Sequence, residues 1–326
     1  MSAPVSPPPD AALPQLRDGP APTPAPGQVL IRVAACGLNF ADLLMLDGRY
    51  QDTPPRPFVP GMEVAGHIAG FGDGVTPDTS GLTLGQAVAG FGGHGVLAEL
   101  ICLPVDRVLP LPPSLTMPQA AGFQIAYGTS HLALTQRAAL QPGETLVVTG
   151  ASGGVGLTAV ELGSRMGARV VALARGADKQ AVARQAGADE TLDSDTPDLR
   201  GALRALGGAD VIYDTVGGDL FTPCLRSLRP LGRYLAIGFA SGQVPQIPAN
   251  LLLVKNISVI GLYWGGYLTF RPALLRQSLM DLLALHDQTP LNLHVSHQLP
   301  FADLHHGLDL LRSRRATGKV VLTLPD

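Results

Sequence analysis

Short apolar runs interrupted by glycine make up the first third of the chain. Runs of this length with turn residues between them predict β-strands, spaced as in a small β-barrel or sandwich. One short helix is predicted at residues 39–46, where an asparagine can cap its start and Gly48 ends it. The predicted strands cover residues 29–35, 58–70, 86–91, 98–102 and 107–109.

From residue 117 onward the pattern changes to helical stretches that alternate with short apolar strands. That alternation is typical of a doubly wound parallel sheet in an α/β protein. A long helix is predicted over 117–140, with an interruption near 127–128. Strands follow at 145–149, 169–174, 210–214 and 233–238, with helices up to 166 and at 177–186, 219–228, 273–286 and 301–313. A last strand, 319–324, is expected to return to the first domain.

Residues 1–28 contain nine prolines, a density that is incompatible with a regular helix. We expect an extended or mobile arm that leads into the first strand. A proline-rich arm can also serve as a peptide ligand, but a loose terminus is the more common case, and we assign it no function.

Residues 149–156, TGASGGVG, form the turn around which the second part of the chain is organised. The apolar run 145–148 precedes it as a buried strand, and residues 157–162 follow as a helix. Ala151, Gly153 and Gly156 have the spacing of the dinucleotide fingerprint, which brings a pyrophosphate to the helix N-terminus. A structural turn without a ligand is the alternative, and the strand–turn–helix context favours cofactor binding.

The end of the next strand, 169–174, indicates which cofactor binds. An NAD-dependent enzyme carries Asp or Glu there to hold the ribose 2′-hydroxyl. This chain has Ala174 and Arg175 instead, followed by Lys179. Two cations suit a 2′-phosphate, which arginine can bind through two parallel hydrogen bonds. We therefore predict NADPH, and the alternative is that both are solvated surface charges.

Composition narrows the class of protein further. The 326 residues are enough for two domains with cores of their own, and 46% of them are hydrophobic. A net charge of −3 gives no reason to expect a nucleic acid or an anionic membrane as partner. Cys36, Cys102 and Cys224 are too far apart for a disulfide framework, and no apolar run is long enough to span a bilayer, so we expect a cytoplasmic protein.

Several motifs resemble those of one family over nearly the whole chain. They are residues 36–42 (CGLNFAD), 60–66 (PGMEVAG), 150–156 (GASGGVG), 213–218 (YDTVGG) and 315–319 (RATGK). The chain resembles the zinc-free quinone oxidoreductases of the medium-chain dehydrogenase/reductase superfamily, and within them the NADPH:quinone reductases similar to ζ-crystallin. The resemblance implies a GroES-like β-rich catalytic domain of residues 1–116 and 264–326, a Rossmann NADP-binding domain of residues 117–263, and a homodimer.

The resemblance also implies that the enzyme holds no metal. Zinc alcohol dehydrogenases of the superfamily have Cys where this chain has Asn39, His where it has Met62, and a third ligand near Gln124. Two amides and a thioether are not a zinc site, because Zn²⁺ favours Cys, His or carboxylate ligands. Without a Lewis acid, hydride transfer from NADPH to an electrophilic acceptor remains feasible, which points to a quinone or an enone.

Family positions that face the nicotinamide and the substrate correspond to Asn39, Asp42, Tyr50, Thr129 and Tyr263. By this resemblance Asn39 hydrogen-bonds the ribose or the substrate oxygen, and Asp42 orients the local network. The two tyrosines stack on a flat acceptor or donate to its developing oxyanion. The alternative for each tyrosine is an amphipathic side chain at a domain surface. We expect the acceptor to bind between the two domains.

The cofactor positions implied by the resemblance run through the whole Rossmann domain. They are Gly153, Gly154 and Val155 for the pyrophosphate, Arg175 and Lys179 for the 2′-phosphate, Thr215 and Phe239 for the nicotinamide half, and Arg315 near the C-terminus. Arg312 and Arg314 beside Arg315 are alternatives. Where relatives have a tyrosine near the adenosine, this chain has Asp193 and Ser194, which weakens the correspondence on the adenine side.

Two other functions stay open. One is an enoyl or acryloyl-type reductase of conjugated alkenes, including CoA thioesters, although the first domain offers few cations for CoA phosphates (Arg32, Arg49 and Arg56). The other is a non-catalytic NADPH-binding protein. The expected homodimer would form through the apolar, β-rich segment 256–262, since an exposed sheet edge aggregates unless it is paired.

Overall fold

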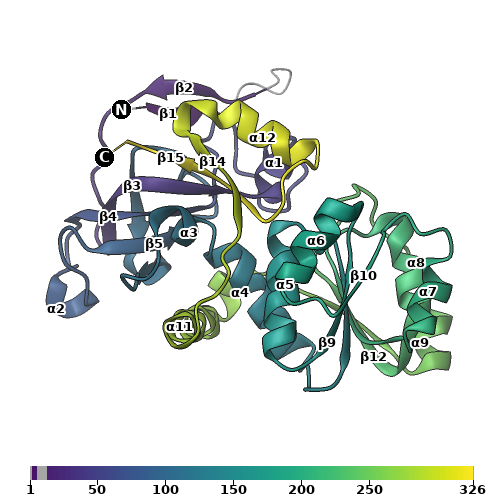
Figure 1. Cartoon of the computed structure of the whole chain (residues 1–326). Helices are drawn as coiled ribbons and strands as arrows, with labels where there is room; N and C mark the ends of the chain where they lie inside the picture. The colour runs from purple at the N-terminus through teal and green to yellow at the C-terminus, as the bar shows by residue number, and fades with distance from the viewer. Residues whose placement is uncertain (1, 6–12, 326) are drawn as a thin grey trace. The chain divides into compact units, whose positions relative to one another are not determined.

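The computed structural model describes residues 2–5 and 13–325, and they form two compact units. The first unit consists of Met1–Ile125 and Leu279–Asp326, and the second of Ala126–Ser278 (Figure 1). The predicted α/β fold, with a β-rich unit and a parallel-sheet unit, is confirmed. The compact units divide at 125/126 and 278/279, and helix α3 packs on strands β3 and β4 of the first unit. The predicted domain boundaries at 116/117 and 263/264 stay predictions.

Seven strands form the sheet of the first unit, in the order β14-β15-β3-β4-β5-β7 with β6 paired to β3. Strands β14 and β15 pair in parallel, and the other pairs recorded in this sheet are antiparallel. Val320 of β15 lies opposite Leu38 of β3, so the prediction that the last strand returns to the first domain is confirmed. The strands are β3 (Gln28–Leu38), β4 (Glu63–Phe71), β5 (Ala87–Phe91), β6 (Leu100–Pro104), β7 (Val108–Pro110), β14 (Val295–Pro300) and β15 (Lys319–Thr323).

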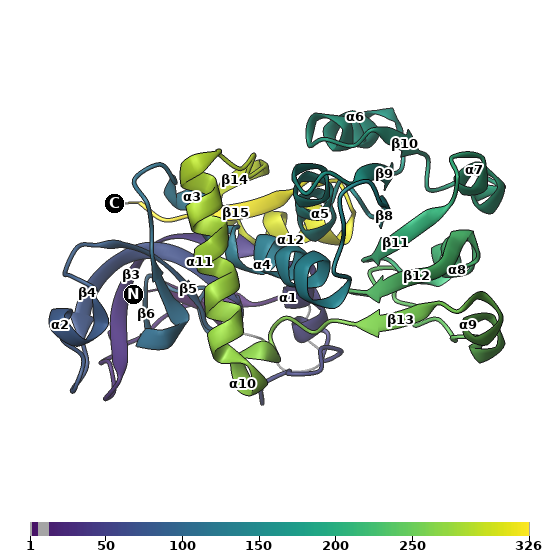
Figure 2. The same ribbon diagram turned by 90° about the horizontal axis from the view of Figure 1, so that it is seen from below.

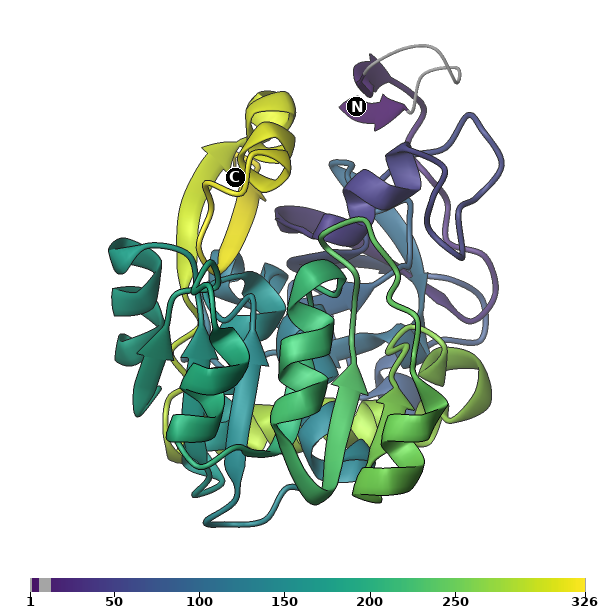
Figure 3. The same cartoon turned by 90° about the vertical axis from the view of Figure 1, so that its right-hand side faces the viewer.

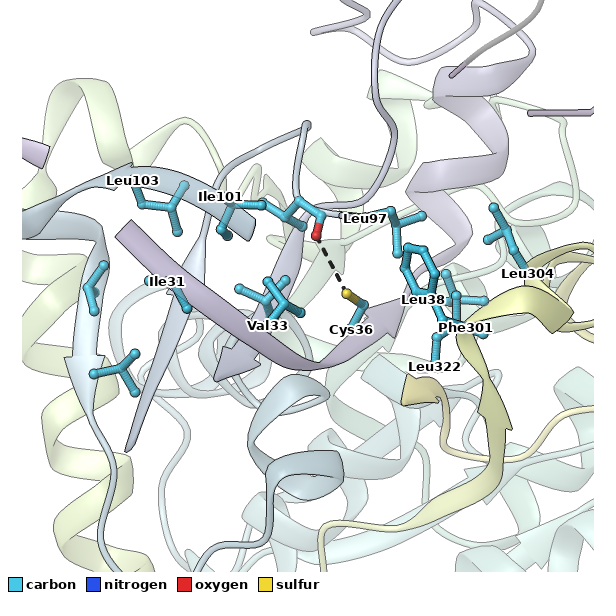
Figure 4. Close-up of a cluster of buried hydrophobic side chains, with 14 of the residues drawn as sticks. Ile31, Val33, Cys36, Leu38, Leu97, Ile101, Leu103, Phe301, Leu304 and Leu322 are labelled. Carbon is cyan, nitrogen blue, oxygen red and sulfur yellow. Dashed lines mark hydrogen bonds between the residues drawn. The ribbon is translucent and has the colours of Figure 1, made fainter. Parts of the chain in front are cut away.

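The alternating burial of side chains along β3 places one face of this strand on the core of the unit. Val29, Ile31 and Val33 are buried at every second position, as expected for a strand with one face on the core. Figure 4 shows Ile31 and Val33 in a cluster with Cys36, whose thiol donates to the carbonyl of Val96 at 3.5 Å. Burial raises the pKa of the Cys36 thiol and the charge of a neighbouring carboxylate raises it further, so this thiol is not a reactive nucleophile.

The helices of the first unit are α1 (Phe40–Leu46), α2 (Pro77–Ser80), α3 (Met117–Ala121), α12 (Leu304–Arg312) and the last part of α11 (Pro272–Gln288). The helix predicted at 39–46 is therefore confirmed, with its start at Phe40 and its cap at Asn39.

The interruption predicted near 127–128 was placed wrongly, since the helical stretch breaks at Gly122 between α3 and α4 (Gln124–Leu132). The break has a physical cause. The carboxylate of Glu63 accepts the N–H of Ile125 at 3.0 Å and so holds the beginning of α4. A Cβ at Gly122 would also lie 3.0 Å from the side chain of Lys319.

The second unit contains a six-stranded parallel sheet in the order β10-β9-β8-β11-β12-β13, which Figure 2 shows from one edge to the other. In order of the chain this is 3-2-1-4-5-6, the order of a dinucleotide-binding sheet, and the Rossmann prediction is confirmed. The order in which strands are added reverses between β8 and β11. The strands are β8 (Thr145–Thr149), β9 (Arg169–Leu173), β10 (Glu190–Leu192), β11 (Ala209–Asp214), β12 (Leu228–Ala236) and β13 (Ser258–Gly261).

Helices cover both faces of this sheet. Figure 1 shows α5 and α6 on one face and α7, α8 and α9 on the other, and the latter three face the viewer in Figure 3. Their bounds are α5 (Gly154–Arg165), α6 (Ala177–Gln185), α7 (Leu199–Ala205), α8 (Phe221–Ser227) and α9 (Ala249–Lys255). Helix α4 continues into a π-helical turn (Ala133–Arg137), and α10 spans Tyr267–Phe270. Strand β13 lies at the edge, as predicted for segment 256–262.

Two described stretches of the proline-rich segment are extended, as expected, and they pair with each other. Strand β1 (Ser2–Val5) pairs antiparallel with β2 (Gln15–Asp18). Residues 6–12 of the predicted arm lie outside the described residues. Across the part of the chain that the structure describes, no helix has the length and apolarity that crossing a membrane requires.

Candidate active site

The fingerprint turn lies between β8 and α5, where the sequence predicted it. Gly150 has a φ of +59°, and a Cβ at Gly156 would lie 2.2 Å from the carbonyl oxygen of Gly150, so both positions require glycine. Gly153 is the N-cap of α5, and Gly154 and Val155 begin the helix, where N–H groups have no partner within the helix. These groups and the positive end of the helix dipole form an anion site suited to a pyrophosphate.

A buried carboxylate, Asp214 at the end of β11, fastens this turn to the neighbouring strand. It accepts hydrogen bonds from the hydroxyls of Thr149 and Tyr234. Burial raises the pKa of Tyr234, and the charge of Asp214 raises it further, so this hydroxyl stays protonated and donates. Sequence inspection assigned Asp214 no role, although the YDTVGG motif contains it.

Thr215 is held directly beside the fingerprint turn. Its N–H donates to the hydroxyl oxygen of Thr149 at 3.0 Å, and its own hydroxyl donates to the carbonyl of Thr149 at 2.9 Å. Both bonds cross from β11 to β8, the point at which the strand order reverses and an open α/β sheet binds its ligand.

Phe239 follows β12 and lies next to the loop that carries Thr215. The N–H of Ala240 donates to the carbonyl of Thr215 at 3.1 Å. A Cβ at Gly217 would lie 2.9 Å from the Phe239 ring, and the ring is 38% exposed. The structure thus brings Thr215 and Phe239 together, as the resemblance implied for the nicotinamide half.

Thr129 is buried on α4, with 6% of its surface exposed. The next residue, Ser130, donates to the carbonyl of Val155 at 3.0 Å and shares hydrogen bonds with the hydroxyls of Thr158 (2.8 Å) and Tyr213 (2.9 Å). These contacts fix α4 against the first turn of α5, so Thr129 lies one residue from a direct link to the fingerprint helix.

The two predicted 2′-phosphate cations lie beyond the end of β9. Arg175 precedes α6, and Lys179 lies in its first turn. Strand β10 pairs parallel with β9 and brings Asp193 and Asp195 to the same corner. The Arg175 guanidinium forms an ion pair with Asp195 at 2.8 Å. The strand end lacks a carboxylate of its own, as predicted, but the segment that follows β10 supplies two acids. The sequence had placed Asp193 near the adenosine and had not indicated Asp195.

In the first unit, Asn39 belongs to a buried network with Glu63 of β4 and Lys319 of β15. Lys319 Nζ lies 2.7 Å from Glu63 Oε1 and donates to Asn39 Oδ1 at 2.6 Å. Asn39 Nδ2 donates to Glu63 Oε1 at 2.9 Å and to the carbonyl of Gly37 at 3.3 Å. Lysine can only donate and a carboxylate can only accept, so the orientation of the Asn39 amide is fixed and both its N–H groups have acceptors within this unit.

Asp42 adds a fourth polar side chain to this network. Its Oδ2 accepts the backbone N–H of Asn39 at 2.7 Å and completes the capping box of α1. Burial raises the pKa of Asp42 from its ordinary value of 3.8 to about 7, while the N–H of Asn39 and the charge of Lys319 act in the opposite direction. The role predicted for Asp42, orientation of the local network, stays a prediction. Glu63 and Lys319 were not predicted.

The three positions that correspond to zinc ligands lie in the first unit. Asn39, Met62 and Gln124 are 8%, 4% and 1% exposed. Asn39 has its amide engaged in hydrogen bonds, and a thioether and a neutral amide do not complete a zinc site. Within residues 2–5 and 13–325, no three His, Cys, Asp or Glu side chains are grouped so that they could hold a metal ion. A metal-free enzyme stays a prediction.

The remaining predicted residues are divided between the units. Tyr50 and Arg315 belong to the first unit, and Tyr263 follows β13 in the second. Arg315 forms an ion pair with Asp309 of α12. The Tyr263 ring lies over the glycines that follow it, since a Cβ at Gly265 would lie 3.0 Å from its hydroxyl oxygen. The roles predicted for these three residues stay predictions.

Family profiles match both units. Residues 25–113 match the alcohol dehydrogenase GroES-like domain, and residues 154–281 match the zinc-binding dehydrogenase profile. The second description names zinc, yet Asn39, Met62 and Gln124 all lie outside the range that it matches.

Whole-chain relatives and solved structures are also similar. The quinone oxidoreductase-like protein 2 homolog of Nematostella vectensis is 39% identical over 301 residues, which covers 90% of this chain and 81% of that protein. A mycobacterial protein complexed with NADPH superposes with a TM-score of 0.92 at 28% identity, covering 99% of this chain and 100% of that one. The quinone oxidoreductase of Thermus thermophilus, solved with and without NADPH, gives a TM-score of 0.85 at 32% identity over 99% of this chain and 100% of that one.

Proposed function

The chain belongs to the quinone oxidoreductase family of the medium-chain dehydrogenase/reductase superfamily, and on that basis we propose that it is an NADPH-dependent reductase that transfers hydride to quinones without a metal. The observation that carries this proposal is the fingerprint turn at the switch point of the parallel sheet, with Thr215 bonded across it to Thr149. The NADPH complexes of the mycobacterial and Thermus proteins support the choice of cofactor.

In this proposal the second unit binds the cofactor. We assign the pyrophosphate to Gly153, Gly154 and Val155 at the start of α5, with the N–H groups of the first helical turn, from Gly154 onward, as its donors. Arg175 and Lys179 take the 2′-phosphate, because a guanidinium and an ammonium complement a dianion. We assign the nicotinamide half to Thr129, Thr215 and Phe239, and Arg315 of the first unit to a further contact with the cofactor.

The proposed chemistry needs little from the protein beyond placement. NADPH, when bound, supplies the hydride, and an electrophilic quinone accepts it. The protein must then stabilise the oxyanion that develops on the acceptor, and hydrogen-bond donors do this. Both N–H groups of Asn39 already have internal acceptors, so we assign Asn39 and Asp42 to a network that fixes this region. Tyr50 and Tyr263 are left as the candidate donors.

Steady-state consumption of NADPH with a simple quinone and with a simple enone tests the function. We expect turnover with the quinone. Faster turnover with the enone would instead identify a reductase of conjugated alkenes. If NADPH binds but neither acceptor is reduced, the protein is a non-catalytic binder and the proposal fails.

The tyrosine roles have their own test at saturating NADPH. If the hydroxyls donate to the oxyanion, Tyr50→Phe or Tyr263→Phe slows quinone reduction by about 10²-fold, the low end for loss of an oxyanion donor. Tyr267→Phe is the matched control, because Tyr267 is buried against Phe270 with ring centroids 4.6 Å apart. Normal rates for both tested variants would remove the tyrosines from the mechanism.

We also propose a homodimer that forms through the edge strand β13. Val259 and Ile260 of this strand are partly exposed, and Leu253 and Val254 of the preceding helix α9 are 78% and 76% exposed. An apolar edge of this kind favours pairing with a second copy. Light scattering that shows a monomer at micromolar concentration would contradict the dimer. Because all three cysteines are free thiols, we propose the reducing cytoplasm as the location.

A further inference from the structure

The corner beyond the ends of β9 and β10 contains more acid than a 2′-phosphate site requires. Glu190 to Leu192 of β10 pair in parallel register with Val171 to Leu173 of β9, so the two strands end side by side. The segment 174–176 therefore meets the segment 193–195. The first contributes Arg175, and the second contributes Asp193 and Asp195.

Asp195 holds the Arg175 guanidinium through both of its oxygens. Arg175 Nε lies 2.8 Å from Asp195 Oδ2, and Arg175 Nη2 donates to Asp195 Oδ1 at 2.9 Å. This is the two-pronged geometry in which arginine also binds a phosphate. The side chains are 61% and 60% exposed, so solvent reaches the pair from outside.

Asp193 occupies the start of α6 in a similar way. Its Oδ2 accepts the N–H of Gly176, the N-cap of the helix, at 2.9 Å, and its Oδ1 accepts the N–H of Asp195 at 2.9 Å. These two backbone hydrogen bonds lower the pKa of Asp193, with a smaller contribution from the charge of Arg175. Asp193 is therefore a charged group that positions the backbone of Asp195 next to Arg175.

We propose that Asp195 is a specificity-determining residue that competes with the 2′-phosphate of NADPH for the Arg175 guanidinium. This inference rests on the proposed function, because it assumes that the second unit binds a nicotinamide dinucleotide. NADH carries a ribose hydroxyl in place of the phosphate and gains nothing from displacing Asp195. The carboxylate therefore lowers the preference for NADPH without affecting NADH.

The Arg175–Asp195 pair is weak enough for Asp195 and the 2′-phosphate to compete for the guanidinium. An exposed ion pair contributes little to stability, so a phosphate that carries nearly two charges can displace it. Asp195 also places a negative charge near the phosphate, which repels it. Removing both the competition for Arg175 and this repulsion should change the affinity for NADPH about fivefold, or roughly 1 kcal/mol.

The test compares dissociation constants for NADPH and NADH by fluorescence titration of the full-length chain at one fixed ionic strength. Asp195→Asn should bind NADPH about fivefold tighter than the wild type and bind NADH within twofold of it. In an Arg175→Ala background the same substitution should change NADPH affinity by less than twofold, because the guanidinium for which the two groups compete is gone. Asp178→Asn is the matched control, since Asp178 is an exposed acid in the first turn of α6.

Three results would overturn the inference. If NADPH affinity is unchanged in Asp195→Asn, there is no competition, and if it is weaker, Asp195 orients Arg175 for the phosphate instead. If Asp178→Asn gives the same fivefold gain, the effect is one of general charge. Failure of the proposed function looks different, because a wild type that binds NADPH but reduces no quinone leaves the competition at Arg175 intact and measurable.

Discussion

Two ion pairs of nearly equal length lie in opposite surroundings, one in each unit of the protein. Lys319 and Glu63 are separated by 2.7 Å in the first unit, with side chains 8% and 0% exposed. Arg175 and Asp195 are separated by 2.8 Å in the second unit, and both are about three-fifths exposed. Breaking a buried pair leaves one charge without compensation, whereas an exposed pair exchanges with water and ions.

The contrast assigns the same chemistry to architecture in the first unit and, in our proposal, to ligand recognition in the second. The buried pair joins β15 to β4 and fixes the Asn39 amide at the start of α1. Rearranging that buried network at each binding event would cost too much free energy, so it is unsuited to a ligand that binds reversibly. The exposed pair can open at little cost, so a charged ligand can replace one of its members.

The largest expected effect is the loss of the buried pair. Lys319→Met leaves the Glu63 carboxylate buried and unpaired, and we expect the free energy of unfolding to fall by about 3–5 kcal/mol in urea titrations. Adding Glu63→Gln to this variant should recover part of the loss, because the uncompensated charge is then gone. A loss below about 1 kcal/mol for Lys319→Met alone would contradict the assignment of this pair to the architecture.

A pH effect at Asp42 should follow next in size. Burial raises the pKa of this carboxyl from 3.8 to about 7, so the folded state favours the protonated form. The contribution of Asp42 to stability is therefore fully present below about pH 4 and is lost as the pH rises through 7. Asp42→Asn cannot ionise, and between about pH 4 and 8 it should gain on the order of 4 kcal/mol relative to the wild type. A parallel pH dependence in the two proteins would exclude a raised pKa at Asp42.

Removing the exposed arginine should act on the ligand. Arg175→Ala takes away a charge-assisted contact worth roughly 1.5–3 kcal/mol, so the NADPH dissociation constant should rise by about tenfold or more while that for NADH is unchanged. Arg184→Ala is the matched control, because Arg184 lies on the same helix α6 and bonds Thr191. An equal loss for the two variants would show that only the overall charge of this surface matters.

The smallest expected effect is that of the exposed pair on stability. Asp195→Asn should change the free energy of unfolding by no more than about 1 kcal/mol, since double-mutant measurements of exposed pairs fall in that range. A urea titration of this variant beside Lys319→Met places the two pairs on one scale. A destabilisation of similar size in both would remove the distinction between them.

Local sequence patterns predicted those parts of the site whose residues are close together in the sequence. The turn at 150–156 between a strand and a helix and the helix at 39–46 depend on spacing and on capping residues, and both elements are confirmed. The network of Asn39 with Lys319 joins residues 280 positions apart, which no local pattern can indicate. Asp195 was missed for the same reason, because its partner Arg175 lies on a different strand–loop segment. The break at Gly122 depends on the hydrogen bond from the N–H of Ile125 to the distant Glu63 carboxylate, and no local pattern predicted it either.

Recognition of the 2′-phosphate of NADPH by the second unit can be measured by titrating the wild type with NADPH and with NADH under identical salt and pH. We expect NADPH to bind about tenfold tighter or more, since Arg175 and Lys179 complement a group that NADH lacks. Equal dissociation constants for the two cofactors would contradict it.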